Sequence, residues 1–447
     1  MADARHLALT VLERVANGSY ADRSLDAALR RERDIDPRDR ALATELVYGI
    51  LRQQNRLDYF LSKLSKTPLQ KMELRVLLLL RIGVYQLLEL DRIPAPIAVH
   101  ETVALAKRVK LARATGFINA ILRRLLRERE QLAWPDPQQD PVAHLTWSGS
   151  LPNWLARRWH KQLGTEALPL AEALRHPAPF TLRVNTLKIS RSDYLQQLLE
   201  AGHDATTTGC APEGILLRKR GASPLPGDAD GLYQIQDEAS MLIAHLLAPT
   251  AGENLLDCCA APGGKTTHLA ALADNRAQIE ALDLHANRLH LIEEGAARLG
   301  CRGIKTRAWD MTNAPDFVTP DSLDGVLVDA PCSGLGVLRR NPEARWHLQA
   351  ADITELAGRQ QQILTQAARL VRPGGRLIYS VCTVTPEETD RVVDTFLAQH
   401  PHYQLAPLDG LLPASCTDLL EDNTRLRSWP HLHGMDGFFA VRLQRIR

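Results

Sequence analysis

Two cysteines that follow predicted strands carry most of the chemistry that this sequence suggests. Cys332 lies in VDAPCSGLG and Cys382 in LIYSVCTVTPEE, and Asp329 precedes the first cysteine by three residues. In an open α/β sheet, residues at the carboxyl ends of strands face the ligand crevice. Two thiols and a carboxylate in such places indicate nucleophilic chemistry on a large substrate. The alternative is that both cysteines are small buried core residues, the usual fate of a free cysteine.

A glycine turn upstream predicts a ligand loop. The segment Cys259–Lys265 reads CAAPGGK between a predicted strand and a predicted helix. A nucleoside-triphosphate loop is disfavoured, because the required early glycine is replaced by Cys259 and Pro262 lies inside the turn. It also lacks the G-x-G-x-x-G pattern of dinucleotide loops. What remains is a tight turn at Gly263 and Gly264 where backbone approaches a ligand, with helix N–H groups facing a carboxylate.

Three acidic residues come at the ends of the following predicted strands. Asp283 ends the second strand, Asp310 the third and Asp329 the fourth. The carboxylate after the second strand usually binds ribose in such folds. Acids along one sheet edge suit a ligand with a ribose, a nucleobase and a positive centre, and S-adenosylmethionine has all three. Alternatively, each aspartate is a turn former or a helix N-cap.

The cysteines match what methylation at carbon 5 of cytosine requires. That carbon is a poor nucleophile, but a thiolate that adds to carbon 6 turns the ring into an enamine that attacks a methyl donor. The reaction needs an activated thiol, a donor at N3 of the ring and a base. Cys382, Asp329 and Cys332 are candidates for these roles.

Periodicity divides the 447 residues into three predicted domains. The first domain, residues 1–140, is predicted to be helical over 1–134, with Asp36 and Pro37 opening one helix and the proline-rich stretch at 134–141 as a linker. Residues 141–230 form a small α+β module. Residues 231–447 alternate strand and helix, which predicts a doubly wound α/β, Rossmann-like sheet with helices on both faces. FFAVRLQ near the end is expected as an antiparallel edge strand.

Composition limits the classes that remain. Neither a targeting segment nor a membrane span is expected. Seven cysteines without a C-x-x-C pair argue against a disulfide framework or a structural zinc site, and favour a reducing cytoplasm. Residues 1–134 carry 24 Lys and Arg against 16 Asp and Glu, although the whole chain has a net charge of +2. This asymmetry suggests a polyanion partner, or else a solvated helical surface.

Together these motifs resemble the Nol/Nop/Sun family of RNA 5-methylcytosine methyltransferases. CAAPGGK, DAPCSG and the cysteine strand before TPEE occur in the family's order within residues 231–447, and the helical first region resembles a NusB-like RNA-binding domain. The combination is similar to the Sun/Fmu-type branch of the family. The resemblance implies S-adenosylmethionine as cofactor, 16S ribosomal RNA as substrate, no metal, and a cytoplasmic enzyme that we expect to be a monomer.

The resemblance also implies roles for individual residues. It makes Cys382 the nucleophile and Cys332 the thiol that assists product release, with Asp329 and Lys265 facing the target base. Asp283 would bind the ribose hydroxyls and Asp310 would lie near the adenine. The loop residues that would bind the cofactor with Asp283, Asp310 and Asp329 are Cys259, Ala260, Ala261, Pro262, Gly263, Gly264 and Lys265.

Two departures from the family pattern are visible. The family usually has Thr-Cys at the nucleophile, whereas this chain has Val381 before Cys382; an additional Cys258 is assigned to the strand core.

Several basic residues are expected near RNA. Because a paired base cannot reach a thiol, the target must be unstacked or flipped. Arg339, Arg340 and Arg345 in RRNPEARW are predicted to contact the RNA backbone. The segment at 151–164, LPNWLARRWHKQLG, is expected either to meet RNA or to pack against a core. Two other functions stay open: an RNA-binding ribosome assembly factor with a vestigial methyltransferase domain, and a methyltransferase acting on a small molecule or protein.

Overall fold

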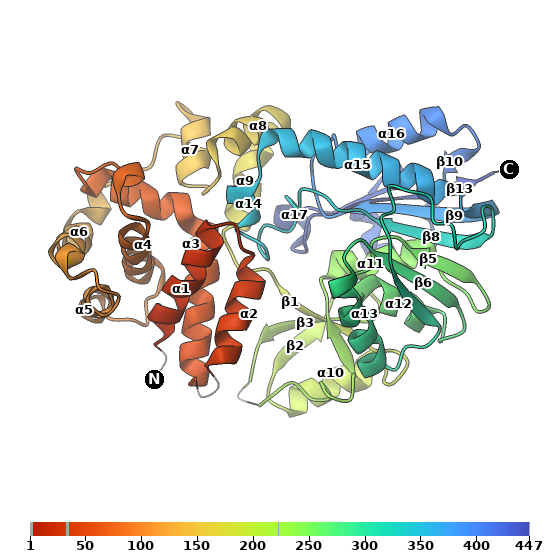
Figure 1. Ribbon diagram of the computed structural model, residues 1–447, viewed down its shortest axis with the longest axis horizontal. Coiled ribbons are helices and arrows are strands. Elements are labelled where there is room, and N and C mark those ends of the chain that lie inside the picture. Colours follow the sequence, from red (N-terminus) through yellow and green to blue (C-terminus); the bar gives the residue numbers. More distant parts are fainter. Residues whose placement is uncertain (1–2, 33–34, 222, 447) are drawn as a thin grey trace. The chain divides into compact units, whose positions relative to one another are not determined.

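The structure is a computed structural model that describes residues 3–32, 35–221 and 223–446. The chain forms two compact units (Figure 1). One comprises Met1–Pro177 with Leu338–Gln349, and the other Ala178–Val337 with Ala350–Arg447. The segment Leu338–Gln349, between strands β8 (Leu323–Asp329) and β9 (Val371–Val381) of the second unit, therefore belongs to the first unit. The division into domains at residues 140 and 230 stays a prediction.

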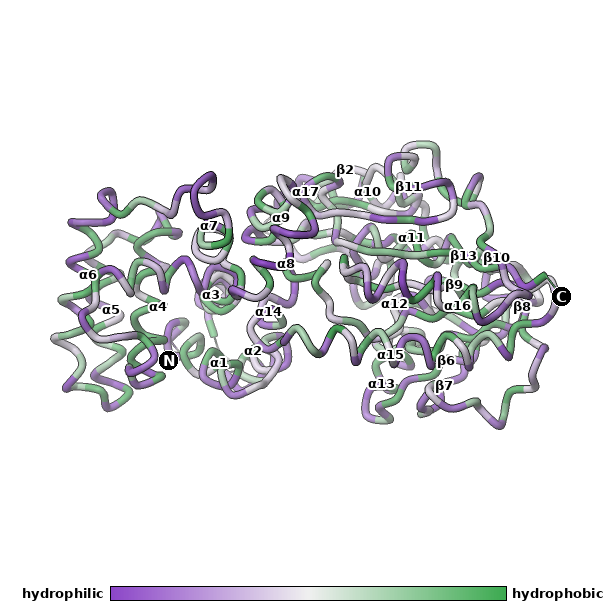
Figure 2. The backbone as a smooth tube through the Cα atoms, turned by 90° about the horizontal axis from the view of Figure 1, so that it is seen from above, coloured by the Kyte–Doolittle hydropathy of each residue, from purple (hydrophilic) through white to green (hydrophobic). Residues whose placement is uncertain are grey.

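The first unit is helical, as its periodicity predicts. Figure 2 shows hydrophobic and hydrophilic residues alternating along its helices. The central helix α4 is buried on most sides and packs against α1, α3, α5 and α6. Helix α3 begins as expected, with the Asp36 carboxylate accepting a 2.7 Å hydrogen bond from the N–H of Arg38 and with Pro37 in the first turn. The helices are α1 (Ala4–Ala16), α2 (Ala21–Arg31), α3 (Pro37–Leu64), α4 (Leu74–Glu89), α5 (Ala95–Arg108), α6 (Thr115–Glu128), α7 (Pro141–Trp147), α8 (Asn153–Leu163), α9 (Ala167–Ala173) and α14 (Ala344–His347).

The returning segment corrects one prediction about RNA. Arg345 in α14 is fully buried and donates 3.2 Å hydrogen bonds to the carbonyl oxygens of Ser150, Leu174 and Leu338. Burial lowers the pKa of this guanidinium to about 9. The predicted contact of Arg345 with the RNA backbone is therefore wrong, because three main-chain acceptors inside the unit already hold it. Arg339 is also buried.

Helix α8 bears on whether the segment at 151–164 meets RNA or packs against a core. Trp159 is 1% exposed and belongs to the core of the unit, so packing accounts for this tryptophan. Arg157 faces solvent, and its Nε donates to Asn153 within the same helix.

The second unit begins with a small antiparallel sheet. Its strands lie in the order β2-β3-β1-β4, and α10 (Arg191–Glu200) packs against β2 and β3. This confirms the small α+β module that the sequence predicts. The strands are β1 (Phe180–Val184), β2 (Asp204–Thr207), β3 (Gly214–Lys219) and β4 (Tyr233–Ile235).

The large sheet of the second unit has a parallel centre. Its order is β11-β12-β13-β9-β8-β5-β6-β7, and β5 to β9 run parallel to one another. From β5 the chain moves outward to β6 and β7, then returns to β8 on the other side, which makes the β5–β8 boundary a topological switch point. The strands are β5 (Asn254–Asp257), β6 (Gln278–Asp283), β7 (Ile304–Ala308), β8 (Leu323–Asp329), β9 (Val371–Val381), β10 (Tyr403–Leu405), β11 (Leu420–Glu421), β12 (Arg425–Arg427) and β13 (Phe439–Arg445).

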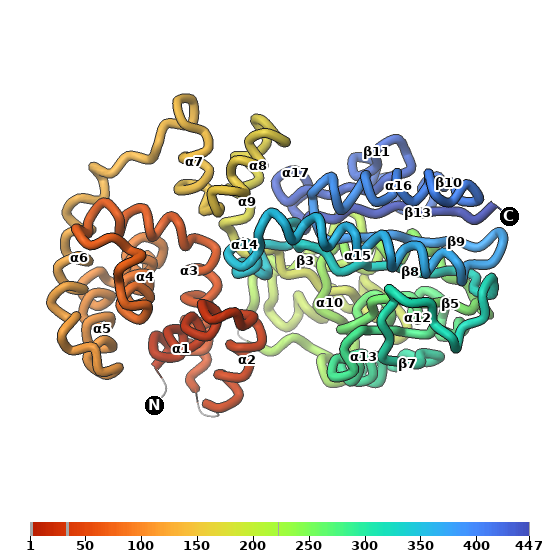
Figure 3. Tube along the Cα trace, turned by 45° about the horizontal axis from the view of Figure 1, so that its top comes forward, coloured from red at the N-terminus to blue at the C-terminus, as the bar shows by residue number. Residues whose placement is uncertain are grey.

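Helices cover both faces of this sheet, as expected for a doubly wound fold. Neighbouring strand residues point to opposite faces. Leu255 packs in a core with α11 and α12, whereas Leu256 packs in another core with α15 and α16. Helices α15 and α16 lie side by side (Figure 3). The helices are α11 (Glu238–Leu247), α12 (Gly264–Leu272), α13 (Ala286–Leu299), α15 (Ala350–Ala368), α16 (Asp390–Gln399) and α17 (Pro430–His433).

The last strand differs in place from its prediction. β13 is antiparallel to β9, as expected, but it is not an edge, because β12 pairs with its other side and β10 also pairs with it. No helix among the described residues is long and apolar enough to cross a membrane.

Candidate functional site

The glycine loop joins β5 to α12 at the switch point. Gly263 has a φ of +100°, and a Cβ there would lie 3.0 Å from the Cα of Ile292. Only glycine fits such a position without strain. The N–H of Gly263 donates to the carbonyl of Ala260 at 2.7 Å, which closes the turn. The loop therefore presents backbone, as the sequence predicts, directly before the N-terminus of α12.

Asp283 lies against this loop. Its carboxylate accepts hydrogen bonds from the N–H of Ala261 at 3.2 Å and of His285 at 2.9 Å. Arg288 Nη1 lies 3.6 Å from the same carboxylate. The carboxylate is thus fixed between the loop and the start of α13, at the end of β6.

Asp310 stands farther out, two residues beyond β7. It accepts hydrogen bonds from the N–H and hydroxyl of Thr312, and the N–H bond holds the pKa of Asp310 below its usual value. Arg359 Nη2 lies 4.0 Å away. The Asp310 side chain is 42% exposed, so it can meet a ligand without moving a neighbour.

A partly buried ion pair joins the first turn of α12 to the end of β8. Lys265 Nζ is 2.6 Å from Asp329 Oδ2, and the hydroxyl of Ser380 donates to Asp329 Oδ1 at 2.8 Å. Burial alone would lower the pKa of Lys265, but the Asp329 carboxylate outweighs it and the pKa is raised. The two groups are thus oriented by the first turn of α12 and by the ends of β8 and β9.

The two cysteines meet beside this pair. Cys332 Sγ and Cys382 Sγ are 3.3 Å apart, although 50 residues separate them in sequence. The sulfur contact with Cys382, together with burial, raises the pKa of Cys332 well above its ordinary value. Cys332 is therefore a thiol at neutral pH, which can donate its S–H to the Cys382 sulfur. Of the two readings left open for these cysteines, the structure favours a shared site.

The other thiols near the loop are placed differently. Cys258 is 1% exposed, and burial raises its pKa well above the usual value, in agreement with its assignment to the strand core. Burial also raises the pKa of Cys259. Val381, in the place of the family's usual threonine, is fully buried in the core shared with α15 and α16. Its side chain thus faces that core.

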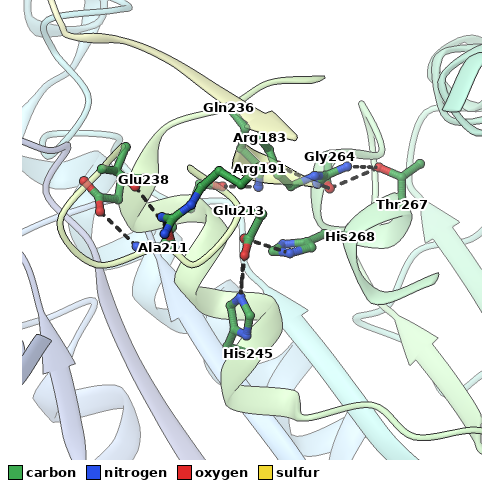
Figure 4. Close-up of polar contacts among 12 residues, drawn as sticks. Arg183, Arg191, Ala211, Glu213, Gln236, Glu238, His245, Gly264, Thr267 and His268 are labelled. Carbon is green, nitrogen blue, oxygen red and sulfur yellow. Dashed lines mark hydrogen bonds and ion pairs between the residues drawn. The ribbon is translucent and has the colours of Figure 1, made fainter. Parts of the chain in front are cut away.

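One site residue that the sequence analysis missed comes from the small sheet. Arg183 of β1 is 3% exposed and donates to Gln236 Oε1 at 2.6 Å, to the carbonyl of Gly264, and to Thr267 Oγ1 at 3.0 Å (Figure 4). It therefore ties the small sheet to the first turn of α12. Nothing local in LRVN signals this role, because its partners lie 53 to 84 residues away.

A second polar cluster lies next to Arg183. Among the described residues, Glu213, His245 and His268 offer ligand atoms close enough for a metal ion. Burial and the charge of Arg183 lower the pKa of His268 to about 4. Burial would raise the pKa of Glu213, but the two histidines outweigh it and the pKa is lowered. A cation here would be repelled by Arg183. We therefore interpret the cluster as an internal network that joins the residue before β3 to α11 and α12 (Figure 4).

Comparison with known proteins identifies the family. The model described as "16S rRNA methyltransferase RsmB/F" matches residues 244–444, "NusB family" matches 2–127, and a ferredoxin-like domain of RsmF/B-like methyltransferases matches 151–223. A Bacillus subtilis protein named "Probable ribosomal RNA small subunit methyltransferase B" is 36% identical over 99% of this chain and 98% of its own length. The chain belongs to the ribosomal RNA small subunit methyltransferase B family.

Other relatives agree with this assignment. The enzyme of that name from Pseudomonas putida is 37% identical over 95% of this chain and 94% of its own. A solved structure described as PH0851 matches with a TM-score of 0.81 and 27% identity, over 100% of this chain and 99% of its own. A structure described as NSun6 from Pyrococcus horikoshii with SFG, at 24% identity and a TM-score of 0.60, covers 67% of this chain and 100% of its own, and supports the fold.

Membership of this family confirms several expectations. The chain is a ribosomal RNA methyltransferase that uses S-adenosylmethionine as its methyl donor. Its first region is NusB-like, its small module ferredoxin-like and its last region a Rossmann-like methyltransferase with a mixed sheet.

Proposed function

We propose that this enzyme methylates carbon 5 of a cytosine in 16S ribosomal RNA through a covalent bond between Cys382 and carbon 6. The observation that carries the proposal is the 3.3 Å separation of Cys332 Sγ and Cys382 Sγ beside the Lys265–Asp329 pair. Carbons 5 and 6 are bonded neighbours in the ring. Two sulfurs this close can therefore serve both carbons of one base.

The proposed reaction begins with addition. The Cys382 thiol loses its proton to solvent, and its sulfur bonds to carbon 6. The Lys265 ammonium gives a proton to N3 as the enamine forms, and takes it back when release restores the aromatic ring. Carbon 5 then attacks the methyl group, and S-adenosylhomocysteine leaves. We place the N3 edge of the base against Asp329 and Lys265, which lie 2.6 Å apart in a partly buried position, because such donors and acceptors orient a ring strongly.

Release requires a base that removes the proton from carbon 5. Cys332 suits this role because its Sγ lies 3.3 Å from Cys382 Sγ, which would place it beside carbon 5 once Cys382 is bonded to carbon 6. After addition, the Cys332 thiol gives its proton to solvent. The Cys332 thiolate then takes the carbon 5 proton, and the bond from Cys382 to carbon 6 breaks. The contact between the two sulfurs thus brings addition and release to one base.

The glycine loop is the proposed cofactor site. Its backbone between Cys259 and Lys265 would face the methionine part of S-adenosylmethionine, close to the N-terminus of α12. Asp283, fixed by two backbone N–H groups, would accept from the ribose hydroxyls, and the exposed Asp310 would lie near the adenine. Asp329 would complete the site next to the transferred methyl group.

The RNA partner is the remaining part of the proposal. Relatives over nearly the whole chain are named for the ribosomal small subunit, which contains 16S ribosomal RNA. The excess of Lys and Arg in residues 1–134 favours binding of a polyanion there. We therefore place the reaction where ribosomes are assembled, in the cytoplasm, and expect the enzyme to act as a monomer.

Replacing Arg183 tests the cofactor site. In Arg183→Gln, the shorter neutral side chain no longer bridges to Gly264 and Thr267, so the loop is less well fixed. We expect about tenfold weaker binding of S-adenosylmethionine by calorimetry, the effect of losing one or two hydrogen bonds. Arg191→Gln is the control, because Arg191 donates to the carbonyl of Ala211, away from the loop. Equal affinity in the two variants would show that Arg183 does not support the site.

Replacing the nucleophile tests the covalent step. A serine hydroxyl at position 382 is far less acidic than a thiol and does not add to carbon 6. We expect Cys382→Ser to lose methylation of ribosomal RNA below detection while its affinity for S-adenosylmethionine stays unchanged. The half-buried Cys301, changed to serine, is the control and should remain active. Methyl transfer by Cys382→Ser would contradict the proposed covalent mechanism.

Replacing the second cysteine tests the release step. Cys332→Ala lacks the base for the carbon 5 proton, so the methylated adduct should persist as a slower band in denaturing electrophoresis with RNA. The double variant Cys332→Ala, Cys382→Ser should give no such band. If Cys332→Ala turns over normally and leaves no adduct, another group removes the proton.

A further inference from the structure

A buried carboxylate connects the two cysteine loops. Glu388, in the turn after β9, is fully buried. Its Oε1 accepts from the N–H of Ser333 at 2.8 Å and from Gln360 Nε2 at 3.0 Å. Its Oε2 accepts from the hydroxyls of Ser333 at 2.5 Å, Thr385 at 2.7 Å and Thr383 at 3.3 Å. Every one of these donors is a neutral group.

The partners of this carboxylate are the immediate neighbours of the catalytic thiols. Ser333 follows Cys332 and Thr383 follows Cys382, and their hydroxyl oxygens are 2.7 Å apart. Both oxygens of Glu388 thus hold residue 333, and one of them also holds residue 383. A carboxylate accepts from several directions and donates nothing, so it can close this ring of donors where an amide cannot.

Two further contacts fix the carboxylate itself. Gln360 of α15 also donates to the carbonyl of Pro331 at 3.0 Å, in the turn that precedes Cys332. The hydroxyl of Tyr379 in β9 donates to the carbonyl of Glu388 at 2.6 Å. The network therefore joins the β8 turn, β9, α15 and the turn after β9 without reaching solvent.

Burying a carboxylate without a cationic partner costs free energy that hydrogen bonds must offset. A hydrophobic residue would fill this place at lower cost if packing were its only task. The cost is explained if the carboxylate fixes geometry that the reaction needs.

We propose that Glu388 is a positioning residue that holds the two cysteine sulfurs at the spacing required for addition and release at one base. The inference rests on the proposed function for its catalytic consequence, but the spacing itself is a property of the free enzyme. Glu388 acts through Ser333 and Thr383 and does not touch the substrate. Its charge also contributes to the raised pKa of Cys332.

The test compares Glu388→Gln with Glu387→Gln. Glu387 is the adjacent carboxylate, and it pairs with Arg391 at 3.2 Å near the surface. Sulfur spacing is measured in the free enzyme with phenylarsine oxide, which condenses with two nearby thiols to a cyclic dithioarsenite and releases water. We expect wild type and Glu387→Gln to bind it equally, and Glu388→Gln to bind it at least tenfold more weakly. Mass spectrometry must find the arsenic on the peptides of Cys332 and Cys382.

Catalysis gives the second readout. The kcat for methylation should fall at least tenfold in Glu388→Gln, with unchanged affinity for S-adenosylmethionine. The pH profile of the release step should move to lower pH, because the charge that raises the pKa of Cys332 is removed. A fold defect alone would not produce this shift.

Each outcome decides between claims. Wild-type arsenical affinity and kcat in Glu388→Gln would overturn the positioning role. If Glu388→Gln binds the arsenical more weakly but Cys382→Ser still methylates RNA, the positioning role of Glu388 stands and the proposed reaction is rejected. If Glu388→Gln fails to fold, Ser333→Ala removes one hydroxyl donor and should give a smaller loss in both readouts; no loss in either would overturn the proposal.

Discussion

The site depends on the register of two parallel strands, β8 and β9. In this register Asp329 is the partner of Ser380, and the Ser380 hydroxyl donates to the Asp329 carboxylate. Cys332 lies three residues after Asp329, and Cys382 lies two residues after Ser380. A slip by one residue would turn one side chain of this pair to the opposite face of the sheet. The carboxylate would then lose its orientation, and the sulfurs would no longer meet.

Around this pair, each remaining part of the site is held by an element from elsewhere in the second unit. Arg183 of the small sheet donates hydrogen bonds to Gly264 and Thr267 in the first turn of α12. The same turn contains Lys265, which contacts Asp329. Glu388 brings the turn after β9 to the turn after β8. The thiols and charges are thus placed by buried hydrogen bonds, whose geometry is narrow, rather than by exposed loops. This explains why a sheet and a small module suffice to hold an ordered two-thiol site.

The sequence revealed what local pattern determines. Strand ends followed by Asp and Cys predicted the sheet edge, because the carboxyl ends of parallel strands meet there. The motifs also predicted the family and the cofactor. The sequence did not indicate a role for Arg183 or Glu388, because their hydrogen-bond partners come close only when segments distant in sequence pack together. Arg345 was misassigned to RNA for the same reason: its acceptors at Ser150 and Leu174 lie far upstream. The edge position expected for β13 failed because β11 and β12 are too short to show a strand pattern.

The central claim is that Cys382 forms the bond to the base while Cys332 assists release. RNA containing 5-fluorocytidine tests it directly, because fluorine on carbon 5 cannot be removed as a proton and the adduct stalls after methyl transfer. The measurement is mass spectrometry of the digested complex of wild-type enzyme, S-adenosylmethionine and this RNA. We predict a methylated fluorocytidine on the peptide that contains Cys382. The same nucleotide on the peptide that contains Cys332, or no covalent adduct at all, would contradict the account.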